Sequence, residues 1–181
     1  KVKKVIAIEK DPLMVKILQK TFKDYNNIEI IQGDVLKDFK LISNFKLQIS
    51  NYKVIANIPY YITSPIIRKF LEEENQPSKI VLMIQKEVAQ RICAKPPNMS
   101  ILAVSVQFYA IPKIISYVSR GCFWPAPNVD SAIIKIIPKS GGRPTSTDFF
   151  KVVKAGFSQP RKQLAGNLSK TLKVDKMGII K

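Results

Sequence analysis

The sequence opens with short apolar runs that alternate with stretches of helical periodicity. Runs such as VKKVIAI and KIVLMI have the length and the β-branched content of buried strands. The strands that these runs predict are Val2–Ile8, Ile28–Ile31, Lys53–Ala56, Lys79–Ile84, Ile101–Tyr109 and Ala132–Ile137.

Between the early strands, apolar residues recur every three or four positions, as in amphipathic helices. Asp11 and Pro12 suit the N-cap and first turn of one helix. Ser64-Pro65 predicts the cap of a second helix, Ile66–Glu74, and a third is expected over Lys86–Cys93. Strands that alternate with helices predict an α/β fold, with a parallel sheet covered by helices on both faces.

A segment rich in glycine, proline and serine, PKSGGRPTST at Pro138–Thr147, predicts a linker. Beyond it, Asp148–Lys173 has helical periodicity. We therefore expect a main domain over residues 1–140 and a small helical domain over residues 141–181.

The amino-acid composition limits the classes of function that are possible. Thirty Lys and Arg against thirteen Asp and Glu give a net charge of +17, spread along the chain, which favours a polyanionic partner such as nucleic acid. No apolar run has the length of a membrane span, and no secretory signal is visible. The chain has no histidine and only two cysteines, Cys93 and Cys122, which excludes Ser-His-Asp catalysis and argues against a zinc site.

Polar residues follow three of the predicted strands: Glu9, Asp34 and Asn57. Ligands of open α/β sheets bind at the carboxyl ends of the strands, so we expect the three at one rim. A carboxylate such as Glu9 suits a ribose diol, and Asp34 suits an exocyclic amine such as that of adenine. The alternatives are a solvated loop acid for Glu9 and a turn former or N-cap for Asp34.

The stretch Asn57-Ile58-Pro59-Tyr60 reads most simply as a turn followed by a tyrosine that covers the core. Chemistry offers a second interpretation. The Asn57 side-chain carbonyl and the Ile58 main-chain carbonyl have the right character to accept both N–H groups of an aromatic amine. Pro59 would fix the turn, and Tyr60 would stack on the base.

Several segments of the chain match known methyltransferase motifs. "NIPYYITSPII" resembles motif IV of adenine-N6 methyltransferases, and "VIAIEKD" and "IIQGDVL" resemble acidic motifs that bind S-adenosylmethionine. More specific are "MIQKEVAQRI", "CFWPAPNVDSAIIKI" and "AGFSQPRKQLAGNL". These three resemble segments of the KsgA family of small-subunit ribosomal RNA adenine dimethyltransferases. The resemblance implies a Rossmann-like methyltransferase sheet with helices on both faces, followed by a small helical C-terminal domain.

The resemblance also implies roles for individual residues. Glu9 would hold the cofactor ribose and Asp34 the cofactor adenine, and Val35 would also bind the cofactor. Asn57 would contact both the cofactor and the target amine. Tyr60 would sandwich the target base with a second aromatic residue. That residue is Phe123, for which core packing is the alternative, although Pro125 and Pro127 favour a rigid loop. RNA contacts and solvated surface are equally good interpretations of Lys86, Arg91, Arg161 and Lys162, whereas Gln85 and Glu87 are expected to be structural.

The function implied is S-adenosylmethionine-dependent dimethylation of adenine N6 in small-subunit ribosomal RNA, with S-adenosylhomocysteine as product. We expect a monomer without metal or membrane association. The alternatives are a non-catalytic RNA-binding or ribosome-assembly factor, a protein like mitochondrial transcription factor B, or an erythromycin-resistance type of large-subunit methyltransferase. Val129-Asp130-Ser131-Ala132 favours the small-subunit group.

The family's glycine-rich E-x-G-x-G motif is not in the chain, and "PRK" stands where the family has R-R-K. We expect both domains to be incomplete and the native N-terminus to precede Lys1. The expected compartment is the cytoplasm, or a mitochondrion, plastid or nucleolus if a targeting segment precedes the chain.

Overall fold

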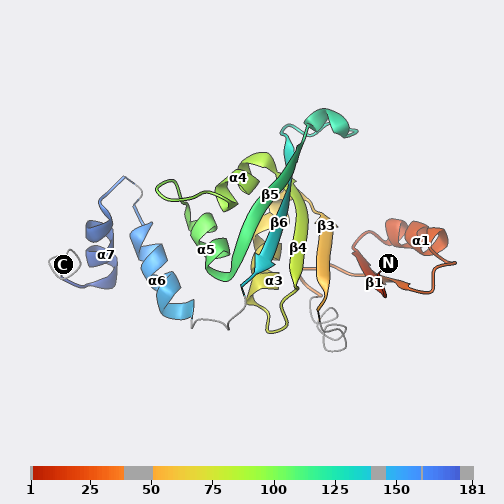
Figure 1. The fold of residues 1–181 in the computed structure, drawn as a ribbon, viewed down its shortest axis with the longest axis horizontal. Coiled ribbons are helices and arrows are strands. Elements are labelled where there is room, and N and C mark those ends of the chain that lie inside the picture. The colour runs from red at the N-terminus through yellow and green to blue at the C-terminus, as the bar shows by residue number, and fades with distance from the viewer. Residues whose placement is uncertain (1, 39–50, 140–145, 160, 176–181) are drawn as a thin grey trace. The chain divides into compact units, whose positions relative to one another are not determined.

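A computed structural model describes residues 2–38, 51–139, 146–159 and 161–175. The chain divides into two compact units (Figure 1). The N-terminal unit holds residues 1–52 with 72–75, and the C-terminal unit holds residues 53–71 with 76–181. Among the described helices, none is long and apolar enough to cross a membrane. The predicted domain boundary near residue 140 stays a prediction, because residues 140–145 lie outside the described residues.

The N-terminal unit contains a parallel pair of strands, β1 (Val5–Glu9) and β2 (Ile28–Gln32), joined through the helix α1 (Pro12–Thr21). The Asp11 carboxylate accepts from the N–H of Leu13 at 2.7 Å, as expected of an N-cap. The strands predicted at both positions and the cap of α1 are therefore confirmed.

The C-terminal unit is built on a four-stranded sheet in the order β3-β4-β6-β5 (Figure 1). The strands are β3 (Lys53–Asn57), β4 (Lys79–Gln85), β5 (Ala110–Val118) and β6 (Ser131–Pro138). β3 and β4 are parallel, whereas β6 runs antiparallel to both β4 and β5. The expectation of a wholly parallel sheet is thus wrong for its second half, and the fold remains α/β.

One face of this sheet forms the core of the C-terminal unit. Side chains alternate between the faces of a strand, and on β4 every second residue is fully buried. The β6 residues that pair with them are buried as well, which gives a continuous apolar layer. The side chains of this layer, each 0% exposed, are Ile80, Leu82, Ile84, Ala132, Ile134 and Ile136.

The helices of the C-terminal unit differ in part from prediction. α3 (Thr63–Glu72) begins one residue before the predicted Ser64-Pro65 cap, and α4 (Lys86–Ile92) agrees with prediction. The strand predicted over Ile101–Tyr109 is wrong, because this segment is the helix α5. The Ser100 hydroxyl caps it by accepting from the Ala103 N–H at 3.3 Å. The strand comes directly afterwards, as β5.

The last part of the chain forms two helices, α6 (Ser146–Gly156) and α7 (Leu164–Leu172), instead of the single helical segment predicted over Asp148–Lys173. α6 packs on α5 through stacked rings of Phe108 and Phe149, whose centroids are 4.0 Å apart. The Asn167 side chain, only 4% exposed, holds the connection between α6 and α7. Its amide donates to the carbonyls of Gly156 at 2.8 Å and Gln159 at 2.9 Å.

Candidate active site

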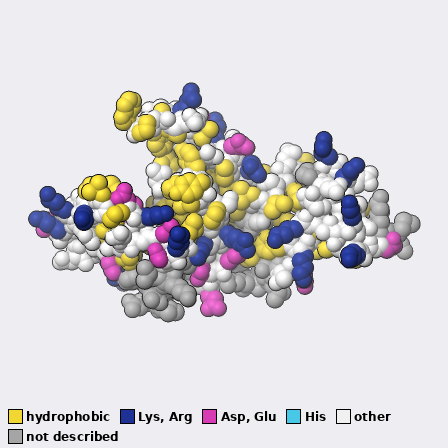
Figure 2. Space-filling model, turned by 180° about the vertical axis from the view of Figure 1, so that it is seen from behind, with side chains coloured by type: hydrophobic (Ala, Val, Ile, Leu, Met, Phe, Trp, Pro, Cys, Tyr) yellow, Lys and Arg dark blue, Asp and Glu magenta, His cyan; other side chains and the backbone are white. Residues whose placement is uncertain are grey.

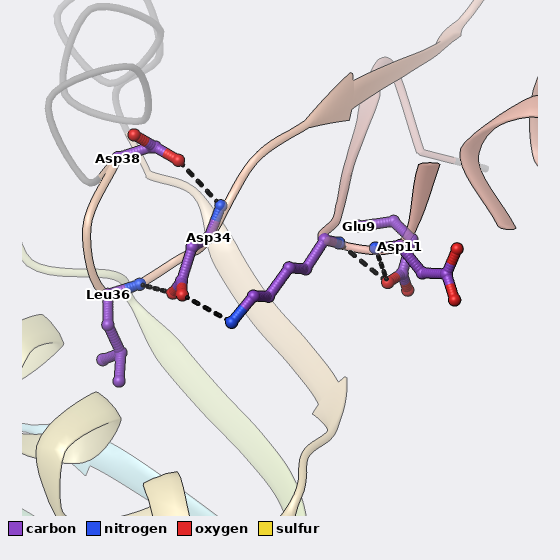
Figure 3. A network of polar contacts seen from close by, with 6 residues as sticks. Glu9, Asp11, Asp34, Leu36 and Asp38 are labelled. Carbon is purple, nitrogen blue, oxygen red and sulfur yellow. Dashed lines mark hydrogen bonds and ion pairs between the residues drawn. The ribbon is translucent and has the colours of Figure 1, made fainter. Parts of the chain in front are cut away.

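The carboxyl ends of β1 and β2 place Glu9 and Asp34 in the same part of the N-terminal unit. The Gly33 N–H donates to the Glu9 carbonyl at 2.9 Å and so joins the two strand ends. Glu9 turns its side chain back onto its own loop (Figure 3). One carboxylate oxygen, Oε1, accepts from the N–H groups of Lys10 at 2.7 Å and Asp11 at 2.9 Å. The carboxylate is therefore fixed in position, and its second oxygen has no hydrogen-bond partner among the residues described.

Asp34 is held by a network of its own (Figure 3). Its Oδ1 accepts from the Leu36 N–H at 3.0 Å, and its Oδ2 lies 3.1 Å from the Lys10 Nζ. The Leu36 N–H, and after it Lys10, hold the pKa of the Asp34 carboxyl below its ordinary value. The Asp34 N–H donates to Asp38 Oδ2 at 2.8 Å, which closes the loop. Asp34 is therefore an ionised acceptor, and Lys10 is a partner that sequence reasoning missed.

Gly33 allows that loop to close. A Cβ at this position would lie 3.2 Å from Asp38 Oδ2, closer than ordinary van der Waals contact. The predicted cofactor residue Val35 follows in the same loop and is partly buried. The loop from Gly33 to Asp38 therefore presents Asp34 in one conformation.

The Asn57–Tyr60 corner lies in the C-terminal unit, where β3 ends. The Ile58 side chain, 7% exposed, anchors it, and Pro59 has φ −56° and ψ 135°. The Asn57 side chain is exposed. Within the described part of the chain, no donor bonds either the Asn57 side-chain carbonyl or the Ile58 main-chain carbonyl. The two acceptors proposed for an aromatic amine are thus both available.

The backbone after the corner is fixed by short-range hydrogen bonds. Tyr60 starts a single turn of 3-10 helix, η1 (Tyr60–Ile62), that leads into α3. The buried Thr63 hydroxyl donates to the Tyr60 carbonyl at 2.9 Å.

The Tyr60 ring is fixed by a contact across the sheet. Its hydroxyl lies 2.7 Å from the hydroxyl of Ser131, which is 0% exposed at the start of β6. The two residues are 71 positions apart in sequence, so no local sequence pattern predicts this contact. The Tyr60 side chain is therefore fixed through its hydroxyl group. The neighbouring Tyr61 side chain, in contrast, is 82% exposed.

Phe123 lies in the loop between β5 and β6, which projects from the rest of the sheet (Figure 1). It is partly buried and follows the short helix η2 (Arg120–Cys122), and its N–H donates to the Arg120 carbonyl at 3.2 Å. The next residue, Trp124, is 99% exposed and is therefore not part of the core. That Phe123 forms the second face of a base sandwich stays a prediction.

The four predicted RNA-binding cations all lie in the C-terminal unit. Lys86 is partly buried and its Nζ lies 3.4 Å from Asp130 Oδ2, whereas Arg91, Arg161 and Lys162 are exposed. Figure 2 shows Lys and Arg side chains spread over the face in view. Among the described residues no cluster of acidic residues and cysteines could hold a metal ion.

Comparisons with known proteins identify the family of the chain. The sequence model of the family described as ribosomal RNA adenine dimethylase matches residues 1–180. The chain belongs to this family. The ribosomal RNA small subunit methyltransferase A of Dehalococcoides mccartyi is 42% identical over 179 residues, which are 97% of this chain and 61% of that protein. The protein of the same name from Bacillus licheniformis is 42% identical over 177 residues, 94% of this chain and 61% of that protein.

Two solved structures share the fold. A dimethyladenosine transferase from Plasmodium falciparum superposes with a TM-score of 0.75 at 32% identity, over 94% of this chain and 63% of that one. The 23S rRNA methyltransferase ErmE has the same TM-score at 22% identity, over 94% of this chain and 68% of that one, which shows the fold alone. The family expected from the sequence motifs and the Rossmann-like α/β fold are confirmed. The chain spans about 61% of the length of the two relatives named above.

Proposed function

We propose that this protein transfers methyl groups to N6 of adenines in small-subunit ribosomal RNA, with S-adenosylmethionine as the donor. The observation that carries the proposal is the corner at Asn57 and Ile58. Two carbonyl acceptors lie there without donors among the described residues, next to a tyrosine whose ring is tied to Ser131. Two acceptors and an aromatic face are what an adenine amine needs in order to be held.

The chemistry of the acceptor explains why those groups suffice. The lone pair of an aromatic amine is conjugated with its ring, so the amine is a poor nucleophile. Hydrogen bonds from its two N–H groups to the Asn57 and Ile58 carbonyls would hold it and favour a lone pair directed out of the ring plane. Stacking on Tyr60, and on Phe123 from the other side, would contribute about 1–3 kcal/mol per contact. A strong base is not needed before attack, because the amine becomes acidic once it is methylated and then loses its proton to water. This suits a chain without histidine.

The residues of the N-terminal unit fit the nucleoside part of the donor. The Glu9 carboxylate is preset by two N–H groups and keeps one oxygen available for a ribose hydroxyl. Asp34 has the ionised oxygens that an adenine amine requires, although Lys10 would have to release one of them. Val35 is a further proposed cofactor residue of this unit, and for Asn57, in the C-terminal unit, a cofactor contact stays a prediction. When bound, S-adenosylmethionine supplies an electrophilic methyl group and leaves as S-adenosylhomocysteine.

The RNA partner is supported by the charge of +17 and by the basic side chains of the C-terminal unit. Lys86, Arg91, Arg161 and Lys162 are the proposed RNA contacts. The two relatives at 42% identity carry the name of small-subunit methyltransferases, which favours the small over the large ribosomal subunit as substrate. We further propose a monomer that acts in the cytoplasm, or in an organelle or the nucleolus if a targeting segment directs it there.

A labelled-methyl transfer assay with the complete protein tests this function. The substrates are small subunits that lack the modification, large subunits and naked RNA. We expect transfer to the small-subunit substrate, and Asn57→Ala should abolish it while RNA binding persists. Tyr61→Phe is the control, because Tyr61 is exposed and lies one residue beyond the corner. RNA binding without transfer by the wild-type protein would favour the non-catalytic alternative, and transfer by Asn57→Ala at the wild-type rate would contradict the pocket.

A further inference from the structure

A polar groove of about 560 Å³ lies in the C-terminal unit, where β4 runs into α4 beside the loop between β5 and β6. This volume is within the range of about 300–1,000 Å³ that is typical of ligand sites. The groove is outside the Asn57–Tyr60 corner, and its lining includes no residue of that corner. Apart from Val129, its lining residues are all polar or charged: Gln85, Lys86, Glu87, Gln90, Arg120, Asn128 and Asp130.

Asp130 connects the two walls of the groove, which are the start of α4 and the loop between β5 and β6. The Lys86 N–H donates to the Asp130 carbonyl at 3.0 Å, and the Lys86 Nζ lies 3.4 Å from Oδ2. From the other wall, the Arg120 N–H donates to Asp130 Oδ1 at 3.1 Å. Lys86 also lies over the ring of Tyr117, with its Nζ 5.5 Å from the ring centroid. These contacts fix the groove before any ligand binds, so little ordering is required on binding.

The lining chemistry indicates what kind of ligand the groove would take. Lys86 and Arg120 are balanced by Glu87 and Asp130, so the groove itself is not an anion site. The other polar groups are carboxamides, each with two N–H donors and a carbonyl acceptor. These carboxamides are Gln85, Gln90 and Asn128, and in the part of the chain that the structure describes none of their side chains has a hydrogen-bond partner. A neutral ligand that both donates and accepts hydrogen bonds matches this lining.

We propose that this groove binds a second unpaired nucleobase of the RNA, in addition to the target adenine. Carboxamides pair with two atoms of a base edge at once, and a guanidinium plane such as that of Arg120 stacks on a base. Unpaired bases of single-stranded RNA are recognised in this way. The proposal rests on the proposed function, because a net charge of +17 and an adenine pocket in the same unit make RNA the expected partner. The site would let the protein select its substrate by a base that it does not modify.

Side-chain NH₂ resonances provide a direct test, because each carboxamide reports on its own hydrogen bonds. The 181-residue chain, labelled with ¹⁵N, is titrated with a single-stranded hexamer of adenylate, and hexamers of cytidylate and uridylate follow. We expect the NH₂ signals of Gln85, Gln90 and Asn128 to shift with at least one of these RNAs. The signal of Asn98, an exposed asparagine outside the groove, should stay unchanged.

Substitutions test the same site by affinity. Gln90→Ala and Asn128→Ala remove exposed side chains, so folding should be preserved, and Asn98→Ala is the matched control. Each groove variant should weaken binding of the preferred hexamer about fivefold or more, the lower end of what one bidentate pair contributes. Unchanged affinity in both variants would contradict base binding in the groove. So would unchanged NH₂ signals of the groove carboxamides while the Asn57 NH₂ signal shifts. Neither result would contradict the target pocket. If neither set of signals shifts with any of the three hexamers, the groove proposal fails, whereas the proposed function is decided separately by the methyl-transfer assay.

Discussion

The hydrogen bond between Tyr60 and Ser131 can be tested by Tyr60→Phe, which removes one oxygen atom and keeps the ring. The partner hydroxyl of Ser131 is 0% exposed and lies 2.7 Å from the Tyr60 hydroxyl. It has no other side-chain partner among the residues described, so the substitution leaves a buried hydroxyl unsatisfied. Such a group costs about 1–3 kcal/mol. At about 2–4 °C per kcal/mol for a chain of this size, Tm should fall by roughly 2–12 °C.

Thermal unfolding followed by circular dichroism measures this loss, with Tyr61→Phe as the control. Tyr61 is 82% exposed, so its substitution should change stability by less than about 0.5 kcal/mol. The double variant Tyr60→Phe with Ser131→Ala removes both partners and should recover most of the stability. Equal Tm values for Tyr60→Phe and Tyr61→Phe would refute the reasoning, and so would strictly additive effects in the double variant.

Two other contacts lead to predictions of the same kind. Asn167→Ala removes the donor to the carbonyls of Gly156 and Gln159, so it should destabilise the chain by about 1–3 kcal/mol in urea unfolding, and an effect as small as that of Asn98→Ala would contradict the assigned role. The Arg120 N–H, and after it Lys86, lower the pKa of Asp130 in the folded chain. The resulting stabilisation is present above the unfolded pKa and is lost as pH falls through the folded pKa. Asp130→Asn should therefore lower Tm at neutral pH and weaken its decline in acid. A Tm profile parallel to the wild type between pH 2 and pH 7 would exclude this contribution, because that range extends from about two units below to about three units above the pKa of an ordinary aspartate.

The elements that sequence reasoning predicted well are those whose local signals agree with their packing. α1 has its Asp11-Pro12 start, and β4 is an apolar run with strand length and β-branched residues. The segment Ile101–Tyr109 was different, because seven of its nine residues are apolar and a short apolar run fits a buried strand equally well. The signal that decides it is Ser100, an N-cap directly before the run.

The strand β5 was missed for a physical reason. Pro112 argues against a central strand, because proline cannot donate to its neighbour. β5 is at the edge of the sheet, where one side of a strand has no neighbour to bond, and a shift in pairing between Ile114 and Ser116 interrupts its ladder with β6. Only the strand order, which is a property of the whole fold, shows that proline is tolerated there.

In the candidate site, too, the sequence predicts some features and not others. The types and positions of Glu9, Asp34 and Asn57 at strand ends follow from the sequence, because each strand is a clear apolar run. The residues that contact the site residues cannot be predicted from the sequence in this way. The ion pair of Asp34 with Lys10 depends on how two loops meet, and the bond from Tyr60 to Ser131 depends on strand pairing across 71 residues.

Trp124 gives the chain a built-in optical probe. It is the single tryptophan of the sequence, and its indole is 99% exposed on the loop that carries Phe123. Its fluorescence therefore reports on this loop alone, from a starting state in which water surrounds the ring. A nucleobase that stacks near Phe123 would shield the indole from an aqueous quencher such as iodide. Binding at the loop can thus be followed in solution without attaching a label to either the protein or the RNA.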